Sequence, residues 1–74
     1  MSETKREKFI RLAENRTQSV IKGIELLGNL SNPNAYEYTN EDLDKVVNAL
    51  KKEVGNLEKI YSLAKDRTNK KFKL

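Results

Sequence analysis

The sequence predicts an all-α protein: an antiparallel two-helix hairpin that assembles into a four-helix bundle or a higher homo-oligomer. Two long segments carry apolar residues at alternating steps of three and four, the spacing that places them on one face of a helix. A segment with the chain's one proline separates them. A chain of 74 residues also buries too little apolar surface to be comfortably stable alone, so association with further copies is expected.

The first helix is expected over residues 5–27. Thr4 and Glu7 have the spacing of a capping box, in which the Thr hydroxyl and the Glu carboxylate each accept from a backbone N–H of the other residue. The apolar stripe that follows consists of Ile10, Ala13, Thr17, Val20, Ile24 and Leu27. Gly28 comes next, and we expect it to end the helix in the left-handed conformation, which carries no Cβ penalty for glycine.

The second helix is expected over residues 40–66. Thr39 and Asp42 repeat the capping-box spacing, and acidic side chains in the first turn suit the positive end of the helix dipole. A seam with heptad spacing then consists of Leu43, Val47, Leu50, Val54, Leu57, Tyr61 and Ala64. Such seams pack helices at shallow angles. Gly55 weakens this helix by roughly 1 kcal/mol relative to alanine without ending it.

The connector, residues 28–39, joins the two helices into one predicted hairpin domain, residues 1–66. A single hairpin leaves part of each apolar stripe in water, and packing two hairpins into a four-helix bundle covers the remainder. Cysteine and histidine are both absent, which excludes disulfides and ordinary zinc sites as a means of stabilisation. We therefore expect a homo-oligomer, with neither a metal nor a cofactor.

The composition of the connector allows two interpretations. Asn32 precedes Pro33 and should be extended, and Pro33-Asn34 suits a tight turn. In the structural interpretation, the polar side chains satisfy the helix ends and the tyrosines cover the open end of the bundle. In the functional interpretation, aromatic faces stack on a base and asparagine amides bind its edges. The candidate ligand-binding residues are Arg16, Asn29, Ser31, Asn32, Tyr36 and Tyr38.

Arg16 lies at the edge of the first apolar stripe, one turn after Leu12 and one turn before Val20. In one interpretation its aliphatic stem packs on the stripe while its guanidinium reaches Glu53 or Glu58 on the second helix. In the other, the guanidinium binds a phosphate or carboxylate at an interface between copies.

The net charge of +4 lies at the C-terminal end of the chain. Residues 65–74 hold five basic side chains and one acidic one, whereas the rest of the chain carries ten of each. In an antiparallel hairpin, the basic tail, residues 67–74, would lie beside the basic start of the first helix. Such a positive end is a footprint for nucleic acid. The residues of this alternative are Lys5, Arg6, Lys65, Arg67, Lys70, Lys71 and Lys73.

The sequence also indicates which broad classes of protein are expected and which are not. No apolar run approaches the roughly 18–20 residues of a membrane span, and no apolar signal-peptide region follows the N-terminus. With the absence of cysteine, this favours a cytoplasmic protein that has no membrane partner. No grouping of acid, base and nucleophile is evident, so an enzyme is the class that the sequence favours least.

Three runs carry a resemblance to known proteins: KREKFIRLAENRT at 5–17, LLGNLSN at 26–32 and YEYTNED at 36–42. Over about residues 4–50, the chain resembles a family of short, uncharacterised helical proteins of bacterial phages and mobile elements. It departs from that family's pattern at 33–35, where a more polar link is usual. The resemblance implies no reaction. It implies a small accessory protein that counters or modulates a host system.

Residues and resemblance together predict a non-catalytic binding protein with a counter-defence role. The expected ligand is anionic, such as a nucleotide immune signal that arginine, tyrosine and asparagine side chains hold, so that the protein acts as a sponge. A host protein is the other expected target. The alternative is a nucleic-acid-binding accessory protein that uses its basic termini. A third interpretation is a structural module whose only partners are other helices.

Overall fold

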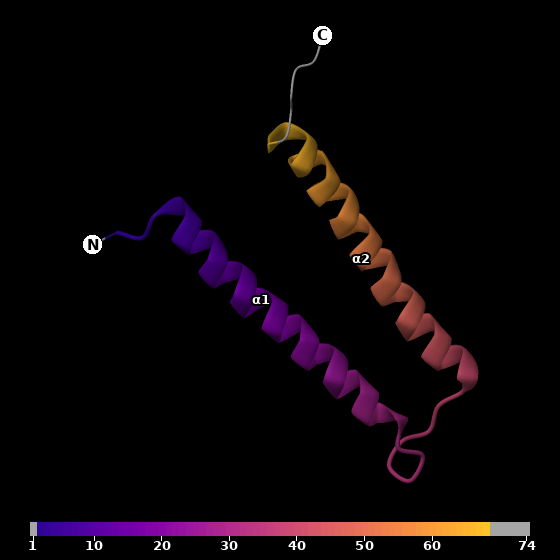
Figure 1. Cartoon of the computed structure of the whole chain (residues 1–74). Helices are drawn as coiled ribbons and strands as arrows, with labels where there is room; N and C mark the ends of the chain where they lie inside the picture. The colour runs from indigo at the N-terminus through magenta and orange to yellow at the C-terminus, as the bar shows by residue number, and fades with distance from the viewer. Residues whose placement is uncertain (1, 69–74) are drawn as a thin grey trace. The chain divides into compact units, whose positions relative to one another are not determined.

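The computed structural model describes residues 2–68 of the chain (Figure 1). Its elements are α1 (Lys5–Gly28), the short 3-10 turn η1 (Asn29–Ser31) and α2 (Asn40–Thr68), and these described residues include no strand. The all-α prediction is therefore confirmed. The predicted helices begin where the observed ones do and end one residue early in α1 and two residues early in α2. Most of the predicted basic tail, residues 69–74, lies outside the described residues.

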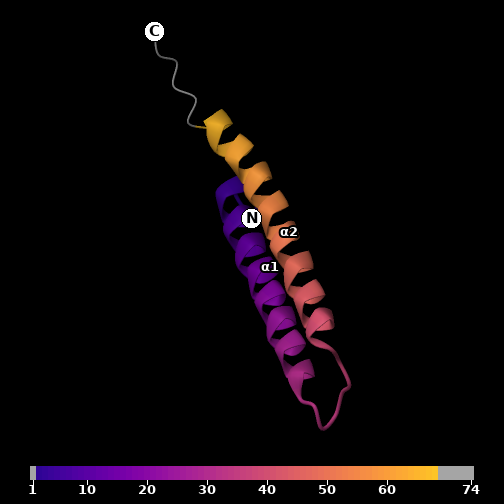
Figure 2. The same cartoon turned by 90° about the vertical axis from the view of Figure 1, so that its right-hand side faces the viewer.

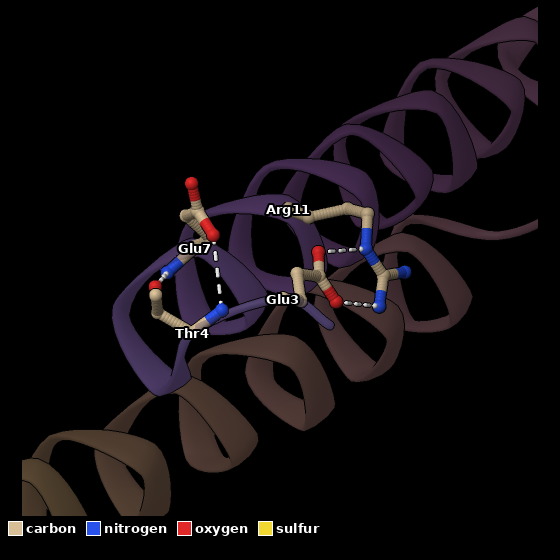
Figure 3. Close-up of polar contacts among 4 residues, drawn as sticks. All are labelled: Glu3, Thr4, Glu7 and Arg11. Atoms are coloured by element: carbon tan, nitrogen blue, oxygen red, sulfur yellow. Dashed lines mark hydrogen bonds and ion pairs between the residues drawn. The ribbon is translucent and has the colours of Figure 1, made fainter. Parts of the chain in front are cut away.

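The start of α1 is fixed by a capping box. The N–H of Thr4 donates to Oε1 of Glu7 at 2.9 Å, and the N–H of Glu7 donates to Oγ1 of Thr4 at 3.0 Å (Figure 3). Thr4 itself is extended, with φ −73° and ψ 165°, so the helix begins immediately after it. Two backbone donors that have no partner within the helix are satisfied in this way, and the predicted box is confirmed.

The end of α1 differs from the prediction. Gly28 has φ −61° and ψ −33°, a right-handed helical conformation, so the predicted left-handed glycine is wrong. The backbone N–H of the next residue, Asn29, still donates to the carbonyl oxygens of the last turn, including that of Glu25. The chain therefore continues into the tighter winding of η1 instead of reversing at Gly28, because this winding also satisfies carbonyl groups at the helix end.

Asn32 organises the connector after η1. It is extended, with φ −74° and ψ 107°, as predicted for a residue that precedes proline. Its side-chain Oδ1 accepts from the N–H of Asn34 at 3.0 Å, and its carbonyl oxygen accepts from the N–H groups of Ala35 and Tyr36 at 3.1 Å each. These bonds close the turn predicted at Pro33-Asn34.

A second capping box begins α2. The N–H of Thr39 donates to Oδ2 of Asp42 at 2.9 Å, and the N–H of Asp42 donates to Oγ1 of Thr39 at 3.0 Å. Figure 2 shows α2 as one continuous helix. Gly55 lies within its bounds and does not interrupt it. A glycine in a helix interior costs conformational entropy but leaves the hydrogen-bond ladder intact, so α2 continues past it as predicted.

The chain divides into two units, Met1–Glu37 and Tyr38–Leu74, each described by itself. Within either unit, described residues twelve or more positions apart never bring their Cα atoms within 8 Å. No described residue is buried as a result. A single helix has no interior, so each apolar stripe depends on another helix for cover. The hairpin and its assembly stay predictions.

Candidate functional site

The seam of α2 is the longest apolar surface of the second unit. Its central side chains are broadly accessible: Val54 is 56% exposed, Leu57 46% and Tyr61 52%. Side chains of this size are normally covered in a folded protein, and contiguous apolar surface of this kind marks sites of association. The α2 seam is therefore the first candidate site, and its chemistry suits another amphipathic helix.

A shallow groove lies on the C-terminal half of the α2 seam. Its lining residues are Val54, Leu57, Glu58, Tyr61, Ser62 and Lys65. Four of them stand at positions i, i+3, i+4 and i+7 of one helix. This is the outline of the hole that receives a single side chain of a neighbouring helix in coiled-coil packing.

The two edges of the α2 seam differ in chemistry. One edge, here called the charged flank, consists of Asp44, Lys51, Glu58 and Lys65. The other, here called the apolar flank, consists of Val46, Glu53 and Ile60. Edge residues decide which helices pair and in which direction, because they face the partner across the rim of the seam.

The stripe of α1 is also uncovered. Val20 is 61% exposed, and Ile10, Ile24 and Leu27 are exposed beside it. At the N-terminal end of α1, the guanidinium carbon of Arg6 lies 6.0 Å from the centre of the Phe9 ring, a cation–π arrangement. A second amphipathic surface is thus available in the first unit.

The connector holds five of the six predicted ligand-binding residues. Asn29 and Ser31 lie in η1, and Asn32 follows directly. The Oδ1 atom of Asn32 is occupied by the turn, which leaves its amide N–H groups as the part of that side chain suited to a ligand. Tyr36 is exposed and Tyr38 is half-buried.

The structure does not bring Arg16, the sixth predicted residue, to the connector of its own unit. Arg16 lies within α1, thirteen residues before Asn29. At a rise of about 1.5 Å per residue, this separates the two by about 20 Å along the helix axis. A site that uses both needs Arg16 from one copy and the connector from another.

An ion pair that the sequence pattern did not predict links Glu3 and Arg11. Nε and Nη2 of Arg11 donate to Oε2 and Oε1 of Glu3 at 2.8 and 3.0 Å, a bidentate arrangement (Figure 3). The hydrogen bonds that the Arg11 guanidinium donates to Glu3 raise the pKa of Arg11 above its ordinary value, and the smaller effect of desolvation lowers it. Because Glu3 precedes the cap, its eight-residue spacing from Arg11 follows no helical period, so only the structure could reveal the pair.

The residues of the nucleic-acid alternative are only partly described. Lys5 and Arg6 are exposed in the first turn of α1, and Lys65 is exposed near the end of α2. Arg67 lies in α2, while Lys70, Lys71 and Lys73 fall outside the described residues. These basic residues form a single positive surface only if the start of α1 lies beside the end of α2. The nucleic-acid alternative therefore stays a prediction.

Residues 2–68 contain no group of three acidic, histidine or cysteine side chains that would hold a metal ion. Neither α1 nor α2, as far as each is described, is both long and apolar enough to cross a bilayer.

No family model matches this chain, and neither curated proteins nor solved structures show a match to it. The resemblance to short helical proteins of phages and mobile elements therefore stays a prediction based on the three sequence runs.

Proposed function

We propose that this chain is a non-catalytic binding protein whose helix hairpins associate, through their apolar stripes, into a homo-oligomer. One observation carries the proposal: both helices leave their apolar stripes exposed, and the α2 seam retains regular heptad spacing throughout. Burying one side chain of the size of leucine or valine contributes about 1.5–3 kcal/mol. The stripes are the largest source of stability that the chain has, and assembly is the means of using it.

The spacing of the apolar residues supports a hairpin in which α1 packs antiparallel on α2 of the same chain. When Ile10 is set level with Leu57, Val20 falls level with Val47, because both helices follow the same alternating spacing. The α1 stripe and the α2 seam then face each other over most of the length of α1.

The edges of the two helices agree with this alignment. Arg16 of α1 falls beside Glu53 on the apolar flank of α2, and Phe9 falls beside Ile60. An ion pair and an apolar pair thus arise from one register, without further adjustment. The charged flank of α2 remains for a second copy, as a four-helix bundle requires of each helix.

We further propose that the target binds at the connector. Tyr36 offers an exposed aromatic face, and the amides of Asn29 and Asn32 offer donors, a combination suited to a nucleotide base. Because Arg16 lies far along the same unit, a phosphate partner would come from another copy. Counter-defence, with a nucleotide immune signal or a host protein as target, fits the resemblance to mobile-element proteins.

Association is tested by sedimentation of the whole chain at tens of micromolar. A homo-oligomer is expected, and a monomer at that concentration would refute the proposal.

Ligand binding is tested by calorimetry against cyclic and linear nucleotides. Tyr36→Ala is expected to abolish binding while the helical circular dichroism stays unchanged, and Tyr36→Phe is expected to retain stacking. If no nucleotide binds the assembled wild-type protein, the nucleotide version of the proposal is wrong.

A further inference from the structure

The charged flank of α2 alternates in sign every seven residues: Asp44, Lys51, Glu58 and Lys65. All four side chains are exposed. Residues seven apart lie along one line at the edge of a heptad seam, so a partner helix on this side meets all four in turn. The pattern is therefore able to select both the direction and the register of that partner.

Pairing within α2 does not explain the opposite charges at the two central positions of the flank, Lys51 and Glu58. On a helix surface, charges stabilise one another at spacings of three and four. Around Lys51 these positions hold Val47, Asn48, Val54 and Gly55, none of which is charged. Around Glu58 they hold Val54, Gly55, Tyr61 and Ser62, again without a charge. The alternation suits a partner outside the helix.

We propose that α2 packs antiparallel against α2 of a second copy of this chain, with Lys51 beside Glu58 and Asp44 beside Lys65 of that copy. The proposal rests on the homo-oligomer proposed above and names its interface. Two-fold symmetry repeats each pair, so two copies make four attractive pairs on one flank. The two helix dipoles also oppose each other, which is favourable.

Neighbouring antiparallel registers are unfavourable. A shift by one heptad in one direction sets Lys51 against Lys51 of the second copy and Asp44 against Glu58. A shift in the other direction sets Glu58 against Glu58 and Lys51 against Lys65. Every flank pair formed in either shifted register is therefore repulsive, which is how edge charges exclude wrong alignments.

A parallel arrangement is disfavoured by the same residues. In a parallel, in-register pair, each residue of one edge faces the opposite edge of its partner five positions further on. Glu53 would then face Glu58 of the second copy, on both sides of the pair. No attractive pair on the edges balances this repulsion, since Val46 and Ile60 occupy the neighbouring edge positions.

The seam itself fits the antiparallel register. Val54 falls level with Leu57 of the second copy, and Leu50 falls level with Tyr61. The groove described on the C-terminal half of α2 then receives Val54 of the second copy. Charge pairing and side-chain packing thus select the same register.

The first test reverses charges on the flank. Lys51→Glu and Glu58→Lys are each expected to weaken self-association by roughly tenfold in Kd, because each turns two attractive pairs into two repulsive ones. An equimolar mixture of the two variants is expected to associate as tightly as the wild type, since every Lys51–Glu58 position is then attractive between unlike chains. The double variant is expected to recover as well, because both members of each pair are reversed together and identical chains again attract. Sedimentation measures each case.

Lys52→Glu is the matched control. It makes the same charge change one residue further along, on the outer face of α2, and its positions at three and four residues also hold no charge. Its association is expected to stay within about twofold of wild type.

The outcomes separate the two proposals. A monomeric wild type refutes the homo-oligomer itself. An oligomeric wild type whose variants all associate normally refutes only the α2–α2 interface. If Lys51→Glu weakens association but the mixture with Glu58→Lys does not recover, Lys51 acts through another neighbour, such as Glu14 of α1, and the interface is wrong.

A second test determines directly whether the two α2 helices pack parallel or antiparallel. The chain has no cysteine, so Val54→Cys and Leu57→Cys each introduce a single thiol on the seam. In the antiparallel register, a mixture of the two variants is expected to give a disulfide-linked heterodimer, while each variant alone is not. If each variant links to itself and the mixture shows no preference, the helices are parallel and the inference is overturned. Circular dichroism on every variant confirms that α2 remains helical.

Discussion

Thr39 and Asp42 exchange two hydrogen bonds across the first turn of α2, at 2.9 and 3.0 Å, and Thr4 and Glu7 do the same at α1. In each pair, two backbone N–H groups that lack a partner within the helix are satisfied by side chains only three residues apart. Both helix starts are therefore determined by local chemistry, whatever the rest of the chain contacts.

Thr39→Ala is expected to destabilise the helical state by about 1 kcal/mol, since one backbone donor at the start of α2 loses its acceptor. Thr39→Ser keeps the hydroxyl and is expected to stay close to wild type. Thermal melts followed by far-ultraviolet circular dichroism measure both. Equal stability of Thr39→Ala and wild type would show that this box contributes nothing.

Leu57→Ala is expected to weaken self-association, by about 2–3 kcal/mol for each subunit, because Leu57 lies in the α2 seam and the change leaves a cavity between helices. Leu63→Ala is the matched control: Leu63 lies off the seam and is 62% exposed, against 46% for Leu57. Sedimentation equilibrium compares the two. Equal effects would mean that the seam is not the association surface.

Gly55→Ala is expected to stabilise α2 by about 0.5–1 kcal/mol, through the lower entropy of the unfolded chain. Apart from adjacent residues and the surrounding helix backbone, no atom lies within 4 Å of a Cβ placed at Gly55 or at Gly23. In the proposed hairpin, however, Gly23 lies beside Val46, so Gly23→Ala is expected to gain less. Melting temperatures compare the pair, and equal gains would argue against the proposed register.

Glu3→Gln is expected to release residues before Thr4 from α1 without shortening the helix, because the capping box remains. Faster hydrogen exchange at the Nε–H of Arg11, which donates to Glu3, is the expected result. Exchange at the Thr4 amide, which donates to Glu7, and the helical circular dichroism are expected to stay unchanged. The pKa of Arg11 is raised above its ordinary value, so its contribution is fully present below that ordinary value and is lost only as the pH rises through the raised pKa. No alkaline loss of the pair is therefore expected at working pH, and a loss near neutral pH would contradict this account.

Much of the fold follows from short spacings in the sequence. The caps at Thr4 and Thr39, the extended Asn32 before Pro33 and the continuous apolar stripes depend on residues at most four apart, which is the range over which helix and turn chemistry acts. The candidate site was less predictable from the sequence than the fold. The sequence placed Arg16 within the first helix and Asn29 in the connector, and the unbroken α1 agrees with that separation. Which helix brings an arginine to a connector depends on contacts between helices, which short spacings do not encode.

By itself, the sequence determined that two amphipathic helices form, where each begins, and which faces need a partner, because these properties arise from backbone geometry and neighbouring side chains. Only the three-dimensional structure decided that Gly28 stays in a right-handed helical conformation and that Glu3 forms an ion pair with Arg11. Both depend on competition among nearby donors and acceptors: the N–H of Asn29 finds its acceptors in the last turn of α1, and the guanidinium of Arg11 lies within reach of a carboxylate that precedes the helix.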